Sequence, residues 1–214
     1  MTIVLIFGDS VVQGFWDYEG GWADRLKQFL MSKSLENEKY FFSVFNLGIS
    51  GDTSKDILER IEFETRQRIK LLEKDEDIIF LISIGSNDSI YNLKTKKHYI
   101  DLKEFENNLT KIFIIAKKYS DKIIFVGDNP VDEDLTNPIP WLKDCSYNNN
   151  FIQKYSKVSE ELCKKDKLYF IEIYNKFSKM KYKELLSDGV HSNSEGHKMI
   201  FEIVKDFLVK NKLI

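Results

Sequence analysis

Cysteine, proline and histidine are scarce in this chain, whose 214 residues include two cysteines, three prolines and three histidines. Cys145 and Cys163 are too few for a disulfide framework, and their spacing does not fit a metal site. We expect both to be free thiols in a reducing compartment. A metal site built from Asp188, His191 and His197 lacks convincing spacing and a fourth ligand, so the sequence predicts neither a metal nor a cofactor.

Long apolar runs and an excess of charge of one sign are also missing. The chain carries 32 basic and 34 acidic residues, a formal net charge of -2, and this balance argues against nucleic acid as a partner. No run approaches the roughly 20 residues of a membrane-spanning helix. The stretch Ile3–Phe7 lacks the length and basic leader of a signal peptide. If Met1 is the natural start, we expect a cytoplasmic protein without membrane insertion, of undetermined oligomeric state.

The chain does contain a regular alternation of two kinds of segment. Five short apolar, branched or aromatic runs are typical of buried strands: Ile3–Phe7, Phe41–Leu47, Ile78–Ile84, Ile123–Val126 and Leu168–Ile173. Apolar residues at helical spacing follow each run, within Trp22–Leu30, Ile57–Ile61, Phe105–Ala116, Phe151–Leu162 and Ile200–Leu208. This alternation predicts a three-layer α/β/α sandwich with a parallel sheet covered on both faces, in one domain of residues 1–214.

Two helix starts and one long loop stand out within this pattern. Thr53 or Ser54 can cap the second helix, and Ser194 can cap the last. The connection from Gly127 to about Asp144 holds all three prolines. A loop of that length after a strand is more often a binding loop or a lid than a plain connection.

Polar residues follow the first three predicted strands. Ser10, in Gly-Asp-Ser, comes after the first strand, and Gly48 and Asn87 belong to the loops of the second and third. In an open parallel sheet, ligands bind outside the carboxyl ends of the strands, where the strand order reverses. With a strand order of 2-1-3-4-5, Ser10 would therefore lie between Gly48 and Asn87.

A serine, an imidazole and a carboxylate together suggest nucleophilic catalysis. A serine needs a nearby imidazole to take its proton, and the imidazole needs a carboxylate to fix its tautomer. Asp188 and His191 are three residues apart, close enough for this contact. We predict Ser10 as nucleophile, His191 as base and Asp188 as the orienting acid. The backbone N–H groups of Ser10 and Gly48 and the amide of Asn87 would form the oxyanion hole.

Each of these residues also has a structural interpretation. Ser10 could cap a helix, Asn87 could close an Asx-turn, and Gly48 could supply an unusual backbone angle. His191 could be a helix-start or core residue, and His197 is interpreted as a packing or surface residue. Four aromatic side chains could line an acyl pocket or cover the sheet edge, and both interpretations stay open: Phe15, Trp16, Tyr18 and Trp141.

Four ordered blocks of this sequence resemble those of the SGNH or GDSL hydrolase family: Gly8-Asp9-Ser10, Gly48 in Gly-Ile-Ser-Gly-Asp, Gly85-Ser86-Asn87-Asp88 and Asp188-Gly189-Val190-His191. Gly20–Leu26 is also similar to the first-helix segment of bacterial acylhydrolases in that family. The resemblance implies a flavodoxin-like sandwich, a metal-independent Ser-His-Asp mechanism and the same residue roles. Val11 and Ser192 stand where the family usually has Leu and Pro, outside the bond-making atoms.

The expected function is that of a serine hydrolase, an esterase or lipase-like acylhydrolase that cleaves a small or medium carboxylic ester or thioester through an acyl-enzyme. One alternative is a carbohydrate or conjugate O-deacetylase of the same family, suggested by the polar loop Asp128–Asn137. Another is a flavodoxin-like binding module whose serine site is vestigial. The expected partner in the first two cases is a small acyl substrate.

Overall fold

A five-stranded parallel sheet forms the centre of the molecule. The computed structural model describes residues 1–37, 41–70 and 76–214. The strands are β1 (Thr2–Gly8), β2 (Phe42–Gly48), β3 (Asp77–Ser83), β6 (Ile123–Val126) and β8 (Tyr169–Ile171), in the spatial order β2-β1-β3-β6-β8. This order confirms the predicted arrangement 2-1-3-4-5, with the strand ends at most two residues from their predicted positions.

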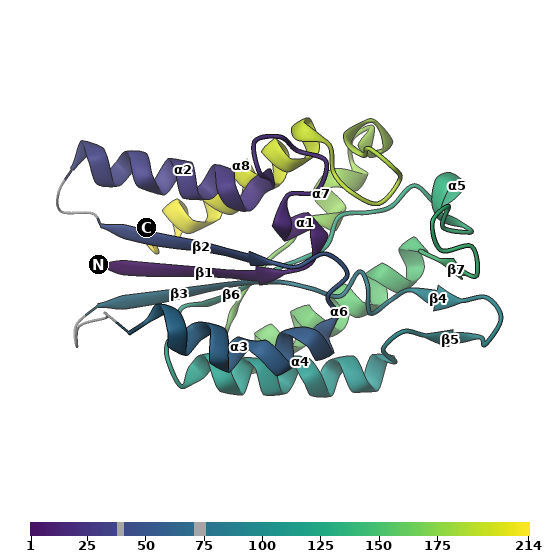
Figure 1. Cartoon of the computed structure of the whole chain (residues 1–214), viewed down its shortest axis with the longest axis horizontal. Coiled ribbons are helices and arrows are strands. Elements are labelled where there is room, and N and C mark those ends of the chain that lie inside the picture. The colour runs from purple at the N-terminus through teal and green to yellow at the C-terminus, as the bar shows by residue number, and fades with distance from the viewer. Residues whose placement is uncertain (38–40, 71–75) are drawn as a thin grey trace.

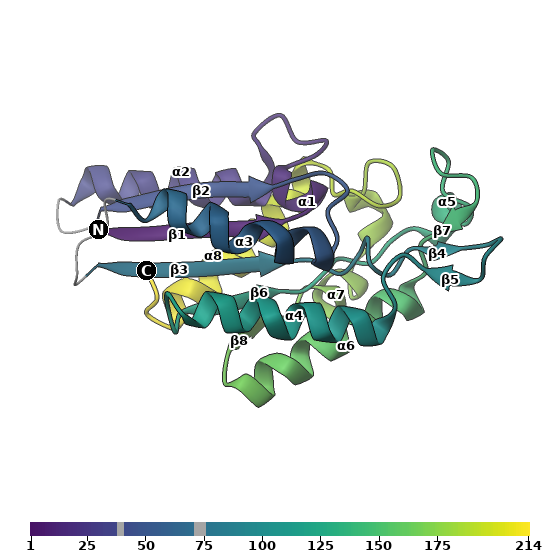
Figure 2. The ribbon, with the colours of Figure 1, turned by 60° about the horizontal axis from the view of Figure 1, so that its bottom comes forward.

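Helices cover both faces of the sheet, as Figures 1 and 2 show. One face carries α2 (Gly21–Glu36) and α8 (Ser194–Lys210), and the other carries α3 (Ser54–Arg68), α4 (Leu102–Lys117) and α6 (Asn149–Asp166). The five predicted helices and the three-layer sandwich are therefore confirmed. Four short helical segments were not predicted: α1 (Ser10–Gln13), α5 (Glu133–Thr136), α7 (Tyr174–Ser178) and the 3-10 turn η1 (Tyr182–Leu185). No helix among the described residues combines the length and apolar character needed to cross a bilayer.

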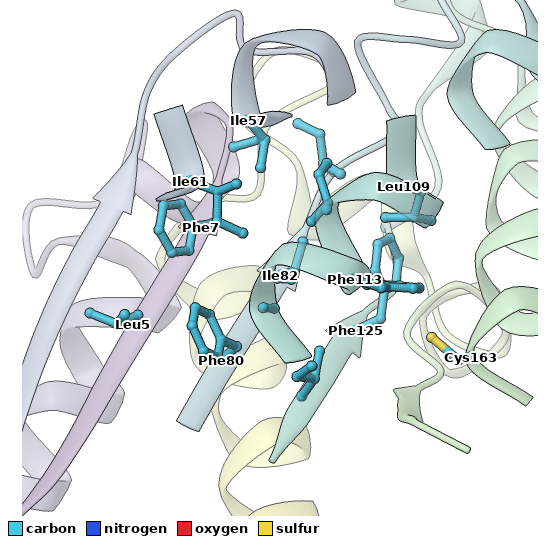
Figure 3. Packing of buried hydrophobic residues seen from close by; sticks show 14 of the residues in the cluster. Leu5, Phe7, Ile57, Ile61, Phe80, Ile82, Leu109, Phe113, Phe125 and Cys163 are labelled. Carbon is cyan, nitrogen blue, oxygen red and sulfur yellow. The ribbon is translucent and has the colours of Figure 1, made fainter. Parts of the chain in front are cut away.

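Alternate residues of β1 pack into two separate cores. Leu5 and Phe7 belong to the cluster under α3 and α4, whereas Val4 and Ile6 belong to the cluster under α2 and α8. Figure 3 shows the first cluster, in which Phe113 of α4 packs with strand residues. Successive strand side chains point to opposite faces, so a strand covered on both sides must be apolar at every position. This explains the unbroken apolar run Ile3–Phe7.

The helix starts agree only in part with the predicted caps. Thr53 caps α3 in a capping box, with its N–H donating to Asp56 Oδ2 at 2.8 Å. The predicted cap of α8 at Ser194 is wrong by one residue, because Asn193 caps the helix and accepts from the Gly196 N–H at 3.0 Å. The Ser194 hydroxyl donates instead to Asp17 Oδ1 at 2.7 Å.

A second, small antiparallel sheet lies beyond the carboxyl ends of the main strands, at the right of Figure 1. It consists of β4 (Tyr91–Asn92), β5 (Lys97–His98) and β7 (Cys145–Ser146), in the order β5-β4-β7. Strands of two residues are too short to show a period in the sequence. This sheet joins the segment after β3 to the end of the long loop 127–144, next to the loops that carry the polar residues.

Candidate active site

The carboxyl ends of the three central strands lie side by side. Gly8 of β1 is in register with Gly48 of β2 and with Ser83 of β3. The chain then turns into α1, whose cap is Asp9 and whose first residue is Ser10. Asp9 accepts a hydrogen bond from the Val11 N–H at 2.9 Å, and its burial raises the pKa of that carboxyl to about 6. The serine is thus held at a fixed turn, only 5% exposed.

Ser10, His191 and Asp188 form one continuous chain of hydrogen bonds. Ser10 Oγ lies 2.9 Å from His191 Nε2, and His191 Nδ1 lies 2.7 Å from Asp188 Oδ2. Burial would raise the pKa of Asp188, but hydrogen bonds from His191 and its charge hold that pKa well below the usual value. An ionised carboxylate can only accept, so the ring proton sits on Nδ1 and leaves Nε2 to accept from the serine hydroxyl. The three residues meet as the sequence predicted.

The loop that carries Asp188 and His191 is held by hydrogen bonds to its own backbone. Asp188 Oδ1 accepts from the N–H groups of Val190 at 3.0 Å and His191 at 2.9 Å. The Ser187 N–H donates to the His191 carbonyl at 2.8 Å, which closes the loop. Gly189 has a φ of 89°, a conformation that side chains disfavour. These contacts explain why a spacing of three brings the carboxylate to the imidazole.

Asn87, a predicted oxyanion donor, is oriented by two hydrogen bonds. Its Nδ2 donates to the Asp52 carbonyl at 2.9 Å, and its Oδ1 accepts from the Tyr147 hydroxyl at 2.7 Å. The amide carries two N–H groups, and the Asp52 contact uses one of them. The bond to Asp52 also joins the loop after β3 to the loop after β2. The two loops therefore meet across the end of β1.

Gly48, another predicted donor, lies directly against α1. A Cβ at this position would come within 2.2 Å of the Gln13 nitrogen, so only glycine fits. Gln13 Oε1 accepts from the Ser50 N–H at 2.8 Å, which fixes α1 to the same loop. The Gly48 N–H donates to Asn46 Oδ1 at 3.1 Å, a partner that sequence reasoning did not identify.

Three of the four aromatic residues noted in the sequence lie around His191 and Asp188, two against the imidazole and one on the carboxylate. The Phe15 ring centre lies 5.0 Å from the imidazole, and Trp141 stacks on it at 6.1 Å with an angle of 27° between the planes. The Trp16 indole donates to Asp188 Oδ2 at 2.8 Å. Tyr18, in contrast, is 91% exposed. Phe15, Trp16 and Trp141 are each more than a third exposed, so they form an aromatic rim around the His191–Asp188 pair.

Arg60 was not identified from the sequence, although it supports the ends of two strands. Its guanidinium lies 2.8 Å from Asp52 Oδ2 and donates to the Leu47 carbonyl at 2.7 Å and to the Gly8 carbonyl at 3.3 Å. It thus fixes carbonyls of β1 and β2 that precede the predicted site. A single arginine on an amphipathic helix offers no sequence signal for such a role.

The long loop 127–144 braces the histidine loop. Asn129 Nδ2 donates to the Val190 carbonyl at 3.2 Å, and the Asp132 N–H donates to the Gly189 carbonyl at 2.7 Å. These residues belong to the polar stretch that suggested a sugar-binding role. The Asn129 side chain holds a residue next to His191, so its polarity has a structural explanation.

His197 is a packing residue within α8, fully buried and not part of the hydrogen-bond chain from Ser10 to Asp188. Its Nδ1 accepts from the Trp22 N–H at 3.3 Å, and its Nε2 donates to the Phe15 carbonyl at 3.1 Å. Burial lowers the pKa of this imidazole, so the ring is neutral. Across the described ranges, no three His, Cys, Asp or Glu side chains gather closely enough to hold a metal ion.

Comparison with known proteins adds a family and a fold. The sequence model for "GDSL-like Lipase/Acylhydrolase" matches residues 4–204. An isoamyl acetate-hydrolyzing esterase 1 homolog from Rattus norvegicus is 26% identical, over 92% of this chain and 78% of that protein. The isoamyl acetate-hydrolyzing esterase of Saccharomyces cerevisiae is 24% identical, over 92% of this chain and 82% of that protein.

Two solved structures illustrate the shared architecture. A lipase/acylhydrolase from Enterococcus faecalis superposes with a TM-score of 0.75 at 22% identity, covering 97% of this chain and 95% of that one. An acetylxylan esterase from Geobacillus stearothermophilus superposes with a TM-score of 0.72 at 21% identity, covering 96% and 92%. At these identities the likeness establishes the fold.

Proposed function

Because the chain belongs to the family of GDSL-like lipases and acylhydrolases, we propose that Ser10, His191 and Asp188 form its catalytic triad. The chain is a hydrolase of the esterase class. The observation that carries the proposal is the unbroken hydrogen-bond chain, 2.9 Å from Ser10 Oγ to His191 Nε2 and 2.7 Å from Nδ1 to Asp188 Oδ2. A serine in this arrangement is activated, which argues against a vestigial binding module.

The first half of the reaction forms an acyl-enzyme. Ser10 Oγ attacks the carbonyl carbon of the ester or thioester while His191 Nε2 takes the hydroxyl proton. Asp188 stays ionised and stabilises the imidazolium that results. The tetrahedral intermediate then collapses, and the departing alcohol or thiol takes the proton from His191. The acyl group remains on Ser10.

The second half releases the acid. Water attacks the acyl-Ser10 carbonyl as His191 removes one of its protons, and collapse of the second intermediate returns that proton to Ser10 Oγ. In both halves the negative charge develops on the carbonyl oxygen, and donors placed in advance stabilise it. We assign this role to the Ser10 and Gly48 N–H groups and to Asn87 Nδ2. Participation of Gly48 requires its N–H to be shared with, or released from, Asn46 Oδ1.

The aromatic rim provides the surface for the substrate. Phe15 and Trp141 lie against His191 and are 39% and 54% exposed, so an ester at Ser10 would meet apolar ring faces. Such faces favour substrates with apolar or ring-shaped groups next to the scissile bond. This arrangement supports small esters and thioesters as substrates. Whether the protein also hydrolyses long-chain esters, as a lipase does, is tested below.

Loss of the nucleophile provides the direct test. We expect Ser10→Ala to abolish hydrolysis of p-nitrophenyl acetate and butyrate and to abolish labelling by a fluorophosphonate probe, with an unchanged circular dichroism spectrum. Activity that persists in this variant would refute the triad. A comparison of acetyl, butyryl, octanoyl and acetylated-sugar substrates on the wild-type chain, with Ser10→Ala as blank, separates a short-chain esterase from a lipase or a deacetylase.

We also propose that residues 1–214 act as a single domain in the cytoplasm. One sheet takes strands from Thr2 to Ile171, and α8 completes its cover. Cys145 and Cys163 are buried free thiols, the state that a reducing compartment maintains. Immunoblotting of cell fractions tests the location, and recovery of the protein in an oxidising compartment would contradict it.

A further inference from the structure

Trp16 donates a hydrogen bond to the acid of the proposed triad. Its Nε1 lies 2.8 Å from Asp188 Oδ2, across 172 residues of sequence. The same oxygen accepts from His191 Nδ1 at 2.7 Å, and Oδ1 accepts two backbone N–H groups. The carboxylate therefore takes part in four hydrogen bonds. Three of them come from its own loop, and the fourth comes from Trp16, near the other end of the chain.

The backbone at Trp16 is held in a conformation that a bulky residue disfavours. Its φ is 65°, at the third position of a turn closed by the Asp17 N–H and the Gly14 carbonyl at 3.1 Å. Glycine or asparagine usually occupies such a position. The residue is also 59% exposed, so burial of its side chain does not explain the strain. Strained positions of this kind concentrate at functional sites.

Buried polar contacts on both sides of Trp16 keep the turn in place. His197 Nε2 donates to the Phe15 carbonyl at 3.1 Å, directly before Trp16. Directly after it, Asp17 is ion-paired with Arg25 at 3.0 Å and accepts from the Ser194 hydroxyl at 2.7 Å. The fold thus fixes the main chain on both sides of an exposed side chain. The rigid main chain thereby holds the indole N–H in position against Asp188.

We propose that Trp16 is a positioning residue of the triad: its N–H fixes Asp188 Oδ2 against the His191 ring and takes up part of the carboxylate charge. This rests on the proposed function of Ser10, His191 and Asp188. The two donors share one oxygen, so removing the indole N–H leaves its full negative charge to His191. The imidazolium is then more stable and the ring loses its proton at higher pH. The freed oxygen is also less well oriented.

Other groups act on the same pair and define the background of the experiment. Asp9 and His197 interact electrostatically with His191, and Tyr147 interacts with Asp188. All three remain in a variant that changes only Trp16. A change in the titration of His191 in that variant is therefore assigned to the loss of the indole.

Trp16→Phe is the test variant, because it keeps an aromatic ring on the same strained backbone and removes the donor. We expect kcat for p-nitrophenyl acetate to fall about 10-fold and the acid limb of the kcat/KM profile to move up by about half a pH unit. Trp141→Phe is the matched control. The ring centre of Trp141 also lies near that of His191, at 6.1 Å. The indole that donates to Asp188, however, is that of Trp16. The acid limb of Trp141→Phe should stay at the wild-type position.

A second readout does not depend on activity. The His191 ring can be titrated by NMR, with its signals identified by their loss in His191→Asn. Its midpoint should rise by about half a unit in Trp16→Phe and stay in place in Trp141→Phe. Trp16→Gly, which suits the backbone at this position, should give the same shift even if Trp16→Phe folds poorly.

Unchanged midpoints and acid limbs in both Trp16 variants would overturn the proposal, and a loss of kcat without any shift would reduce Trp16 to a structural role. Failure of the triad itself would look different. In that case Ser10→Ala would keep its activity, while the NMR midpoint would still report whether Trp16 acts on the Asp188–His191 pair.

Discussion

The Tyr147 hydroxyl donates a hydrogen bond to Asn87 Oδ1 at 2.7 Å, within the interior of the protein. Tyr147 is 5% exposed, and the other end of the same amide donates to the Asp52 carbonyl. The oxygen and the nitrogen of the Asn87 amide are therefore both fixed before a substrate binds. A donor that needs no reorganisation stabilises a developing oxyanion best. Tyr147 thus supports the donor that we assign to the oxyanion hole.

Tyr147→Phe should lower kcat about 10-fold with little change in KM, because the amide loses the contact that orients it while the substrate-binding surface is kept. Steady-state kinetics on p-nitrophenyl acetate measure this. Tyr155→Phe is the matched control, since it removes another buried hydroxyl, which bonds to the Ile100 carbonyl. That control should lose stability but keep the wild-type kcat.

The double variant adds a stricter test of the same contact. Asn87→Ala alone should cost about 100- to 1000-fold in kcat, the usual effect of one oxyanion donor. If Tyr147 acts through Asn87, adding Tyr147→Phe should cost nothing further. Fully additive losses would show that Tyr147 acts by another route.

Asp9 should make the free energy of unfolding depend on pH. Burial raises its pKa from 3.8 to about 6, so the folded protein binds this proton more tightly than the unfolded chain. The corresponding stability is complete below about pH 4 and is lost as the pH rises through 6, a loss of about 3 kcal/mol.

Asp9→Asn keeps an oxygen that can accept from the Val11 N–H and removes the titration. Relative to wild type, its free energy of unfolding should be about equal near pH 4 and about 3 kcal/mol higher at pH 7, measured by urea titration. Asp121→Asn, which removes an exposed carboxylate, serves as control. A difference between Asp9→Asn and wild type that does not vary with pH would contradict the prediction.

Phe113 of α4 should be among the most costly side chains to truncate. It is fully buried in the cluster beneath α3 and α4, with its ring centre 6.4 Å from that of Phe125. Phe113→Ala should reduce the free energy of unfolding by about 3–5 kcal/mol through lost contacts and a cavity. The adjacent Ile114 is 55% exposed, and Ile114→Ala should stay within about 0.5 kcal/mol of wild type. Equal effects at the two positions would contradict the assigned packing.

Much of the fold was predictable because each layer leaves its own period in the sequence. Ile3–Phe7 is unbroken because β1 is covered on both faces, and the residues of α4 repeat at helical spacing because one side packs on the sheet. The cap of α8 was misplaced because Asn193 and Ser194 are both good capping residues and only the backbone geometry selects one of them. The strands β4, β5 and β7 were missed because two residues show no period.

The candidate site also has one part that the sequence predicted and one part that it did not. Ser10, His191 and Asp188 were predicted because nucleophilic catalysis demands particular residue types, and the loops after parallel strands meet at one edge of a sheet. Their supporting contacts were not predictable. Tyr147 with Asn87 and Arg60 with Leu47 join segments whose spacing in sequence carries no signal.

The sequence by itself determined which positions of each segment are apolar, and hence the order of strands and helices along the chain. The reason is that burial of one or both faces of a segment leaves a periodic apolar pattern in that segment. The sequence also determined the residue types available for chemistry. Only the tertiary structure decided which partners those residues meet, because a hydrogen bond such as that from Trp16 to Asp188 depends on the packing of two distant loops to within a few tenths of an ångström.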